Sequence, residues 1–261
     1  MQDWLQVLRL DTSATEKDRG CDVWDNDNCC NYSADGTKLL DAENYPSEVH
    51  VKDGTKVICD GVFAFQPYMA EDRKIGEDIP EEERASFLDK IFLPPTVTHI
   101  GREAFRECGW LKSIRLPKDL IFIGDGAFFG CWELRSVSCP AGLVAIGDGA
   151  FEECFSLNKV KFNKGLKAIG AGAFRACESL EEIVLPAGLE FIGDDAFYGA
   201  SLKKIFVPKS VTKIEDAAFN FDPKLEYIYY EGTKEDWGKI EIGEYNDSLL
   251  AETAKILYNQ N

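Results

Sequence analysis

The chain has 261 residues, 45% of them hydrophobic, and a formal net charge of −17 at pH 7. This length can bury a long core, whereas the acidity argues against nucleic acid or an anionic membrane surface as a partner, because both attract clustered Lys and Arg. Solubility is the simplest explanation of the acidity, and no stretch approaches the ~18 apolar residues of a membrane-spanning helix, so no membrane insertion is expected.

Residues 1–44 are predicted to form an N-terminal cap. Asp35-Gly36 lies between two strand-like runs, and this dipeptide favours a two-residue hairpin turn. The first ten residues lack the basic region, the long apolar core and the small-residue cleavage site of a secretion signal. Either an export signal has been removed from this chain or the protein stays inside the cell, and the sequence does not decide between the two.

Cysteine and acidic residues in this region offer two candidate sites. The irregular cysteines are Cys21, Cys29, Cys30 and Cys59. Disulfides that clasp the cap are the first interpretation, and a zinc site is the alternative, although the chain has no Cys-x-x-Cys pair. A neighbouring cluster with calcium-ligand chemistry consists of Asp22, Asp25, Asn26, Asp27 and Asn28. It lacks the loop Gly and the closing Glu of an EF-hand, which favours a solvated turn.

A degenerate first coil over residues 49–63 is followed by an insertion. Ile58 precedes Ile100 by 42 residues, which is one 23-residue period plus about 19 extra residues. The extra stretch, about residues 66–86, carries seven acidic and three basic residues, a net charge of −4. Insertions in solenoids form loops on one face and can make the binding site, but a tolerated solvated loop is the simpler interpretation.

One phrase, Ile-Gly-x-x-Ala-Phe, then repeats along the chain. Its copies begin at Ile100, Ile123, Ile146, Ile169 and Ile192, each 23 residues after the one before. A last copy begins 22 residues further on at Ile214, where Glu215 replaces the Gly. A fixed period of this length predicts a solenoid, in which each unit buries its apolar face only by stacking on its neighbours. The array is predicted to cover residues 45–230 as one elongated domain.

Each unit can be interpreted from the copy at residues 111–131. Ile114 and Leu116 lie two residues apart and share the inner face of a predicted strand, which Pro117 ends because it has no amide proton. Gly124 is expected to let the chain turn. Residues 127–131, Ala-Phe-x-x-Cys, are expected to close the coil with a short helical or 3₁₀ turn. The predicted fold class is a β-rich repeat solenoid with parallel strands.

The remaining cysteines fit this repeat. Four of them recur every 23 residues at one coil position, where Ala200 later takes over: Cys108, Cys131, Cys154 and Cys177. We expect reduced, buried thiols that pack in a ladder, with disulfides between neighbouring rungs as the alternative. Cys139 replaces a strand Leu, and the same reasoning applies to it.

Residues suited to catalysis are few. The two histidines, His50 and His99, have no recognisable nucleophile motif nearby and are interpreted as ordinary solenoid residues. The repeated Gly follows Ile in each unit that carries it, so it serves the coil and does not form a phosphate-binding loop. We therefore predict no enzymatic activity, no cofactor and no metal.

Residues 231–261 are predicted to form a C-terminal cap. Thr233 has the chemistry of a helix N-cap for a short helix that runs through Trp237. The indole of Trp237 is expected to cover the last apolar coil, because terminal units with a polar outer side keep solenoids soluble.

The unit resembles the BspA-type leucine-rich repeat. The matching residues are Leu-x-x-Ile-x-Leu-Pro-x-x-Leu-x-x-Ile-Gly-x-x-Ala-Phe-x-x-Cys at 111–131. The hairpin at 32–40 and the segment from Tyr229 to Asn259 are similar to the leading and closing segments of such proteins in gut Firmicutes. The resemblance implies a right-handed leucine-rich-repeat superhelix, a bacterial cell-surface or extracellular location, and binding or adhesion without shared chemistry.

If the chain has a binding site, the outward strand positions are where we expect it, because leucine-rich solenoids present their sheet on an extended face. The candidate residues are Phe92, Arg115, Lys159, Lys161, Val184, Lys204, Phe206, Tyr227 and Tyr229. Apolar side chains gather at the C-terminal end of this face, which indicates either an interface for a protein or glycan partner or a surface that the C-terminal segment covers.

Three functions remain open from the sequence. The first is a non-enzymatic adhesion or recognition module, and the second is a structural spacer of a larger surface protein with no ligand of its own. The third and weakest is an enzyme or metalloprotein built around the N-terminal cysteines. The partner and the oligomeric state are not determined by the sequence.

Overall fold

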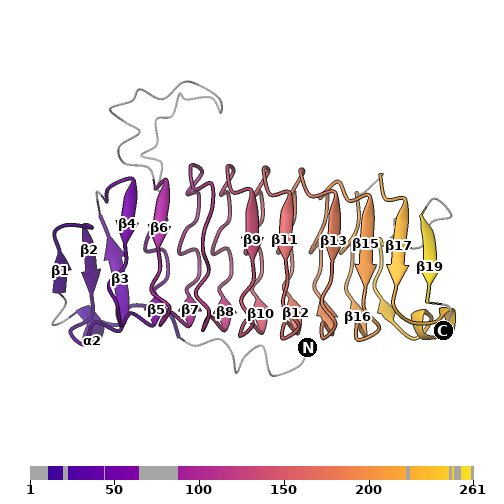
Figure 1. Ribbon diagram of the computed structural model, residues 1–261, viewed down its shortest axis with the longest axis horizontal. Coiled ribbons are helices and arrows are strands. Elements are labelled where there is room, and N and C mark those ends of the chain that lie inside the picture. The colour runs from indigo at the N-terminus through magenta and orange to yellow at the C-terminus, as the bar shows by residue number, and fades with distance from the viewer. Residues whose placement is uncertain are drawn as a thin grey trace, which may run out of the picture.

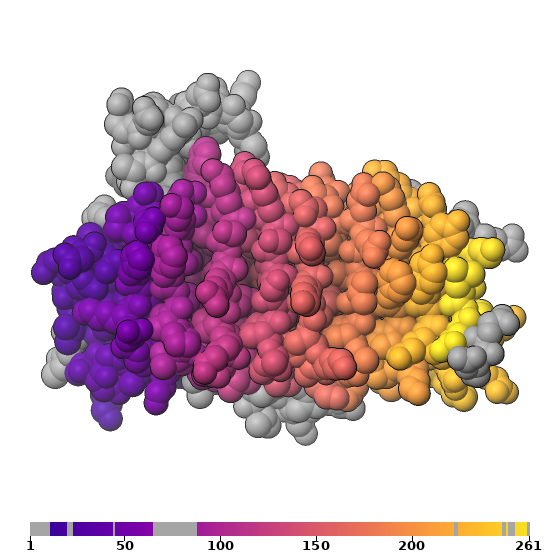
Figure 2. All heavy atoms as spheres, in the orientation of Figure 1, coloured from indigo at the N-terminus to yellow at the C-terminus, as the bar shows by residue number. Residues whose placement is uncertain are grey.

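A computed structural model describes residues 11–19, 23–43, 45–64, 88–221, 224–246, 249 and 254–259. The chain forms an elongated stack of coils, and two rows of short parallel strands run along its length (Figure 1). In the space-filling view the colours follow one another from end to end of a rod, because each coil lies against the coils before and after it (Figure 2). The predicted repeat solenoid is confirmed.

The stack begins with a small antiparallel unit. Its elements are α2 (Glu16–Arg19), β1 (Val23–Asp25), β2 (Cys30–Tyr32) and β3 (Lys38–Ala42). Strands β1, β2 and β3 pair antiparallel, and β3 then pairs parallel with β5 (Val57–Ile58), the first strand of the stack. The N-terminal hairpin therefore supplies the surface on which the first coil lies.

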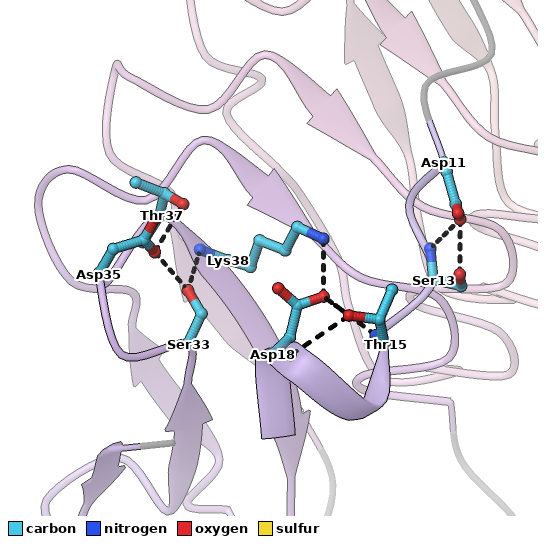
Figure 3. A network of polar contacts seen from close by, with 8 residues as sticks. All are labelled: Asp11, Ser13, Thr15, Asp18, Ser33, Asp35, Thr37 and Lys38. Carbon is cyan, nitrogen blue, oxygen red and sulfur yellow. Dashed lines mark hydrogen bonds and ion pairs between the residues drawn. The ribbon is translucent and has the colours of Figure 1, made fainter. Parts of the chain in front are cut away.

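The turn between β2 and β3 is longer than the expected two residues. The amide of Gly36 donates to the carbonyl of Ser33 at 2.7 Å, and the amide of Ser33 donates to the carbonyl of Lys38 at 3.0 Å. Gly36 takes the left-handed φ of 69° that the turn requires, and the Asp35 carboxylate accepts from the amide and hydroxyl of Thr37. The Asp35 side chain thus stabilises the loop through these hydrogen bonds, as Figure 3 shows.

The longer of the two rows is an eleven-stranded sheet built on the Ile-Gly phrase. Beyond β5 its strands are β7 (His99–Ile100), β8 (Phe122–Ile123), β10 (Ala145–Ile146), β12 (Ala168–Ile169), β14 (Phe191–Ile192), β16 (Lys213–Ile214) and β18 (Glu241–Ile242). From β5 to β18 each pairing is parallel and places Ile opposite Ile. The sequence predicted no strand here, because an apolar pair followed by Gly resembles the start of a turn.

The repeated Gly has a different role from the one expected. Gly124 does not take a left-handed φ. A Cβ added there would lie 2.6 Å from the carbonyl carbon of Gly101 in the preceding coil. Glycine is needed because two backbones approach closely at this point, and not because the chain must turn.

The second row is formed by the strands predicted around the Leu-x-x-Ile-x-Leu phrase. They are β4 (Glu48–His50), β6 (Lys90–Phe92), β9 (Ser136–Ser138), β11 (Lys159–Lys161), β13 (Glu182–Val184), β15 (Lys204–Val207), β17 (Tyr227–Tyr230) and β19 (Lys255–Tyr258). Hydrogen bonding divides them into β4-β6, β9-β11 and β13-β15-β17-β19. At the copy used to define the unit, the predicted strand is reduced to one bridge between Ser113 and Ser136.

A ladder of phenylalanine rings fills the interior. Consecutive rings from Phe63 to Phe219 lie 5.0–5.3 Å apart between centroids, with planes within 9° of parallel. The stack includes Phe105, Phe128, Phe151 and Phe174, each fully buried. The predicted register, in which equivalent residues lie on one another along the rod, is confirmed.

The Ala-Phe segment of each coil is a series of turns. In one coil the amides of Ala104, Arg106 and Cys108 each donate to the carbonyl three residues earlier. Glu103 and Glu107 take left-handed φ values of 54° and 58°, which interrupt the path after each turn. The hydrogen-bond step is that of the expected 3₁₀ turn, but no continuous helix forms in this described coil.

The C-terminal residues add a further coil. Thr233 caps α4 (Lys234–Trp237) with a reciprocal capping box, and Trp237 is buried edge-on against Tyr230, as predicted. Beyond the helix, β18 pairs with β16 and β19 pairs with β17, so both rows continue past residue 230. The domain boundaries at residues 44/45 and 230/231 stay predictions. The insertion at 66–86 lies outside the described residues.

Candidate functional site

The second row of strands presents its alternate residues outward, where the candidate site residues were expected. Phe92 and Val184 are 48% and 54% exposed. Arg115, Lys159 and Lys161 are exposed as well, and the four candidates nearer the C-terminus are half-buried: Lys204, Phe206, Tyr227 and Tyr229. We call this set of outward positions on β4 to β19 the sheet face.

The structure brings only part of the predicted set together. Strand register places Val184 beside Phe206 and Phe206 beside Tyr229, so these three form one column across neighbouring coils. Phe92 lies at the other end of the row, where its ring stacks on His50 with centroids 4.4 Å apart. Phe92 is therefore separate from the C-terminal cluster.

Two residues of the sheet face were missed by sequence reasoning. Strand β19 pairs in register with β17, which places Lys255 beside Tyr227 and Leu257 beside Tyr229. The column thus reads Val184, Phe206, Tyr229 and Leu257. The alternation in Lys-Ile-Leu-Tyr at 255–258 was the available signal, but the helix and the longer spacing before it hid the repeat.

The described part of the C-terminal segment extends the cluster instead of covering it. Phe206 and Tyr229 stack with centroids 4.5 Å apart and planes 8° from parallel, and Tyr227 lies 6.1 Å from Tyr229. The rings of Phe206 and Tyr229 are still partly exposed to solvent, although β19 lies beside β17. The apolar column remains open to solvent along its outer edge.

A groove of about 670 Å³ runs along the end of this column, where the strands reach their prolines. Its floor and walls include the outward column and the turn residues Pro186 and Pro208. Its polar lining residues are Asn163, Lys164, Glu231 and Asn259. The groove crosses five successive coils, about 19 Å at the ~4.8 Å spacing of neighbouring strands.

The sheet face is basic on an acidic protein. Its outward positions between residues 113 and 257 include five cations: Arg115, Lys159, Lys161, Lys204 and Lys255. The same positions carry one carboxylate, Glu182, while the whole chain has a net charge of −17. None of the five cations makes a salt bridge to another residue that the structure describes. Lys90, further toward the N-terminus, lies 3.2 Å from Glu48.

Three of the four N-terminal cysteines lie in the part of the chain that the structure describes. Cys29, Cys30 and Cys59 are free, so disulfide pairing among these three is wrong, and Cys21 lies outside the described residues. Burial raises the pKa of the Cys30 and Cys59 thiols to about 12. Such thiols stay protonated and are poor nucleophiles and ligands at neutral pH.

The cysteine ladder is buried and reduced, as predicted. The thiols of Cys131, Cys154 and Cys177 donate to the carbonyls of Phe105, Phe128 and Phe151 at 3.2–3.3 Å. Burial raises the pKa of each thiol. Their hydrogen bonds point along the stack, so these side chains hold coils together and face no solvent.

No cation site is formed by the acidic cluster within the described residues. The Asp25 carboxylate accepts from the amide of Asp27 at 3.0 Å and from the side-chain amide of Asn28 at 3.2 Å. It lies 3.8 Å from the ammonium of Lys52. These contacts are those of a turn, and Asp22 lies outside the described residues.

The histidines have ordinary surroundings. His99 is half-buried, its Nδ1 lies 2.9 Å from the Thr98 hydroxyl, and burial lowers its pKa. His50 is exposed and lies 3.2 Å from Glu48.

Over the described residues, no helix has the length and apolarity that a membrane crossing requires.

Known proteins with the same repeat decide the family. A model of the BspA type leucine rich repeat region matches residues 98–226 in six copies. A leucine-rich repeat protein of T. pallidum is 31% identical with a TM-score of 0.52, and the match covers 56% of this chain and 67% of that one. The chain belongs to the BspA-type leucine-rich repeat family.

Other solved bacterial proteins are similar to this chain at lower identity. The pneumococcal vaccine antigen PcpA is 17% identical with a TM-score of 0.57, over 92% of this chain and 71% of that one. A leucine rich cell surface protein of Faecalibacterium prausnitzii A2-165 is 24% identical with a TM-score of 0.40, over 77% of this chain and 62% of that one. Among curated proteins, no relative of this sequence is found.

Proposed function

We propose that this BspA-type repeat protein is a non-enzymatic recognition module of a bacterial surface or secreted protein, and that it binds a protein partner through the C-terminal end of its sheet face. The observation that carries the proposal is the open apolar column of Val184, Phe206, Tyr229 and Leu257 beside a groove of about 670 Å³. Exposed apolar patches beside grooves mark interaction sites, and aromatic anchors dominate their energetics.

The ring geometry favours a protein over a glycan. A sugar ring binds on the open face of an aromatic ring. Phe206 and Tyr229 cover one face of each other at 4.5 Å, and their other faces look along the column toward Val184 and Leu257. What they present to solvent is their edges, which suit the side chains of a polypeptide partner.

The location at the surface rests on the family alone. The absence of enzymatic activity is also part of the proposal. It is supported by the high pKa of the buried thiols and by the lack, among described residues, of a cluster with metal-binding chemistry.

Replacing both Phe206 and Tyr229 with Ser tests the proposal. The purified protein is measured by surface plasmon resonance against a panel of host matrix proteins and against a glycan array. For a protein that binds, the double variant is expected to lose more than about tenfold in affinity, because each aromatic anchor contributes over ~1 kcal/mol. Its melting temperature should change little, since both side chains are half-exposed.

A matched control removes two aromatic side chains elsewhere. Phe155 and Phe221 are 37% and 65% exposed and lie outside the sheet face, so their double replacement by Ser should leave binding unchanged. If the sheet-face variant binds as tightly as the unmodified protein, the proposal is wrong. If no member of the panel binds, the result would favour the alternative function, a structural spacer of a larger surface protein.

A further inference from the structure

We propose that the partner segment is an acidic polypeptide, which lies along the stack with its carboxylates over the basic centre of the sheet face and its apolar residues in the C-terminal groove. This inference rests on the proposed function and adds the chemistry of the ligand. Two independent features of the face carry it, one electrostatic and one apolar.

The electrostatic feature is the segregation of charge. The chain has 46 acidic and 29 basic residues, yet the outward positions from Ser113 to Leu257 hold five cations and one carboxylate. A patch of surface with the average composition of the chain would carry a net negative charge. Lys159 and Lys161 have serines opposite them on the neighbouring strand, and Glu182 lies opposite Lys204 alone. The surplus of cations on this face favours an anionic partner.

The cations are free to accept such a partner. Lys159 and Lys161 are exposed on β11, Arg115 is exposed two coils earlier, and none of them forms a salt bridge with a described residue. By contrast, Lys203 is held by Glu181 at 2.7 Å just off the face. Carboxylates of a partner can therefore pair with Arg115, Lys159 and Lys161 without breaking an internal ion pair.

The apolar feature distinguishes a polypeptide from other polyanions. Along one outward column the residues change from Arg115 and Lys161 to Val184, then to the Phe206–Tyr229 stack and Leu257. A nucleic acid or a sulfated glycan carries charge along its whole length, so it does not match the apolar half of the column. A polypeptide can carry carboxylates in one half and apolar side chains in the other.

The dimensions suit an extended segment. From Arg115 to Leu257 the column crosses six coil steps, about 29 Å at ~4.8 Å per step. An extended chain spans this distance with about nine residues at ~3.3 Å each. The ligand lies along the stack, across the strands, so it does not add a strand to the sheet.

Binding of defined probes to the full chain tests the inference. One probe is a fluorescein-labelled peptide of about twelve residues, with glutamates through one half and leucine and phenylalanine in the other. It is used in both sequence orders, because the direction of the ligand is open. The comparison probes are the same peptide with lysine for glutamate, a heparin fragment and single-stranded DNA.

Charge reversal on the face is compared with charge reversal elsewhere. The double variant Lys159→Glu with Lys161→Glu should bind the glutamate peptide about tenfold more weakly than the unmodified protein. Added salt should lower the affinity of the unmodified protein for this peptide more than that of the variant. The control is Arg102→Glu with Lys234→Glu, two exposed residues off the face. Both double variants change the net charge by the same −4, so the control isolates the face from the overall field and should bind normally.

The possible results separate this inference from the proposed function. The proposal of an acidic ligand would be overturned by equal binding of the glutamate and lysine peptides or by no binding of either. Normal binding of the glutamate peptide by the Lys159→Glu, Lys161→Glu variant would also overturn it. Heparin or DNA binding that depends on Lys159 and Lys161, without peptide binding, would also overturn it in favour of another polyanion. If a protein partner is lost with Phe206→Ser and Tyr229→Ser but not with charge reversal, the proposed function stands and the acidic ligand does not.

Discussion

The two rows of strands come from the same repeat but differ in regularity. In the eleven-stranded sheet each Ile pairs with Ile of the next coil, and the sheet is unbroken. The other row is divided into three hydrogen-bonded groups, and its outward residues change from basic to aromatic along the stack. Where neighbouring backbones touch, the sequence is constrained. Where side chains meet only solvent, the sequence is free to specialise.

Polar contacts reinforce the regular sheet. After the repeated Gly, the Asp125 carboxylate accepts from the amide of Asp148 in the next coil at 3.0 Å, and Asp148 accepts from Ala171 at 2.8 Å. Asp194 and Asp216 repeat the arrangement further along. The sheet therefore has a second, side-chain ladder at its edge, whereas the sheet face has its charged groups directed to solvent.

Phe151→Ala should have the largest effect, because it removes a ring from the interior that both rows share. Phe151 is fully buried between Phe128 and Phe174, at 5.1 and 5.3 Å. We expect a loss of about 3–5 kcal/mol in the free energy of unfolding, measured by urea denaturation. Phe155→Ala, on an exposed ring of the same coil, is the control and should lose less than ~1 kcal/mol. Equal losses would mean that the ring stack does not carry the stability.

The next prediction separates two reasons for glycine within one coil. At Gly147 a Cβ would lie 2.7 Å from the backbone of Gly124 and Asp125, whereas at Gly149 the backbone takes a left-handed φ of 59°. Gly147→Ala should cost about 1–3 kcal/mol, because backbone of the adjacent coil must move, and Gly149→Ala about 1 kcal/mol from local strain. Thermal unfolding of both variants measures the difference. A smaller effect at Gly147 would contradict the close-contact explanation.

The sequence was sufficient for the inner part of this fold. A period of 23 residues fixes which side chains stack, so Phe105, Phe128 and their equivalents could be aligned before any geometry was known. It was insufficient for the Ile-Gly strands. Two residues are too short for an alternating pattern, and what makes them a sheet is the hydrogen bonding between coils.

The candidate site was predicted in part. Alternation in each strand identified the outward residues, and Phe206 and Tyr229 do lie together. Leu257 was missed because α4 lengthens the last interval from Ile214 to Ile242 to 28 residues, which disguises the final coil. The charge contrast between face and chain was underestimated, because Lys255 joins the face only when β19 is placed beside β17.

Thr233→Ala tests how that final coil is held. The Thr233 hydroxyl accepts from the amide of Asp236, and the Asp236 carboxylate accepts from the amide of Thr233. Removing this capping box should cost about 1 kcal/mol and speed hydrogen exchange in β18 and β19. Thr212→Ala, which removes only an exposed hydroxyl contact to Glu190, should stay within ~0.5 kcal/mol of the unmodified protein. Unchanged exchange in both strands would show that the cap is not what orders them.

The smallest expected effect is the response of the two ends of the stack to acid. At the N-terminal end, hydrogen bonds from the Thr37 amide and then from the Ser33 and Thr37 hydroxyls lower the pKa of Asp35 from 3.8 to about 2. At the C-terminal end, the Lys239 ammonium and then Thr233 lower the pKa of Asp236 from 3.8 to about 2. A lowered folded-state pKa means that each carboxylate stabilises fully above pH 3.8 and loses this contribution as the pH falls through about 2.

Amide chemical shifts of Thr37 and Thr233, followed by NMR as a function of pH, should therefore titrate with midpoints below 3.8. Raising the salt concentration from about 0.05 to about 0.5 M should move the Asp236 midpoint upward, because it depends on the exposed charge of Lys239. The Asp35 midpoint should move less, since its partners are neutral. A midpoint at or above 3.8 in Asp35 would show that its hydrogen bonds do not persist in solution, and the hairpin would then owe its turn to Gly36 alone.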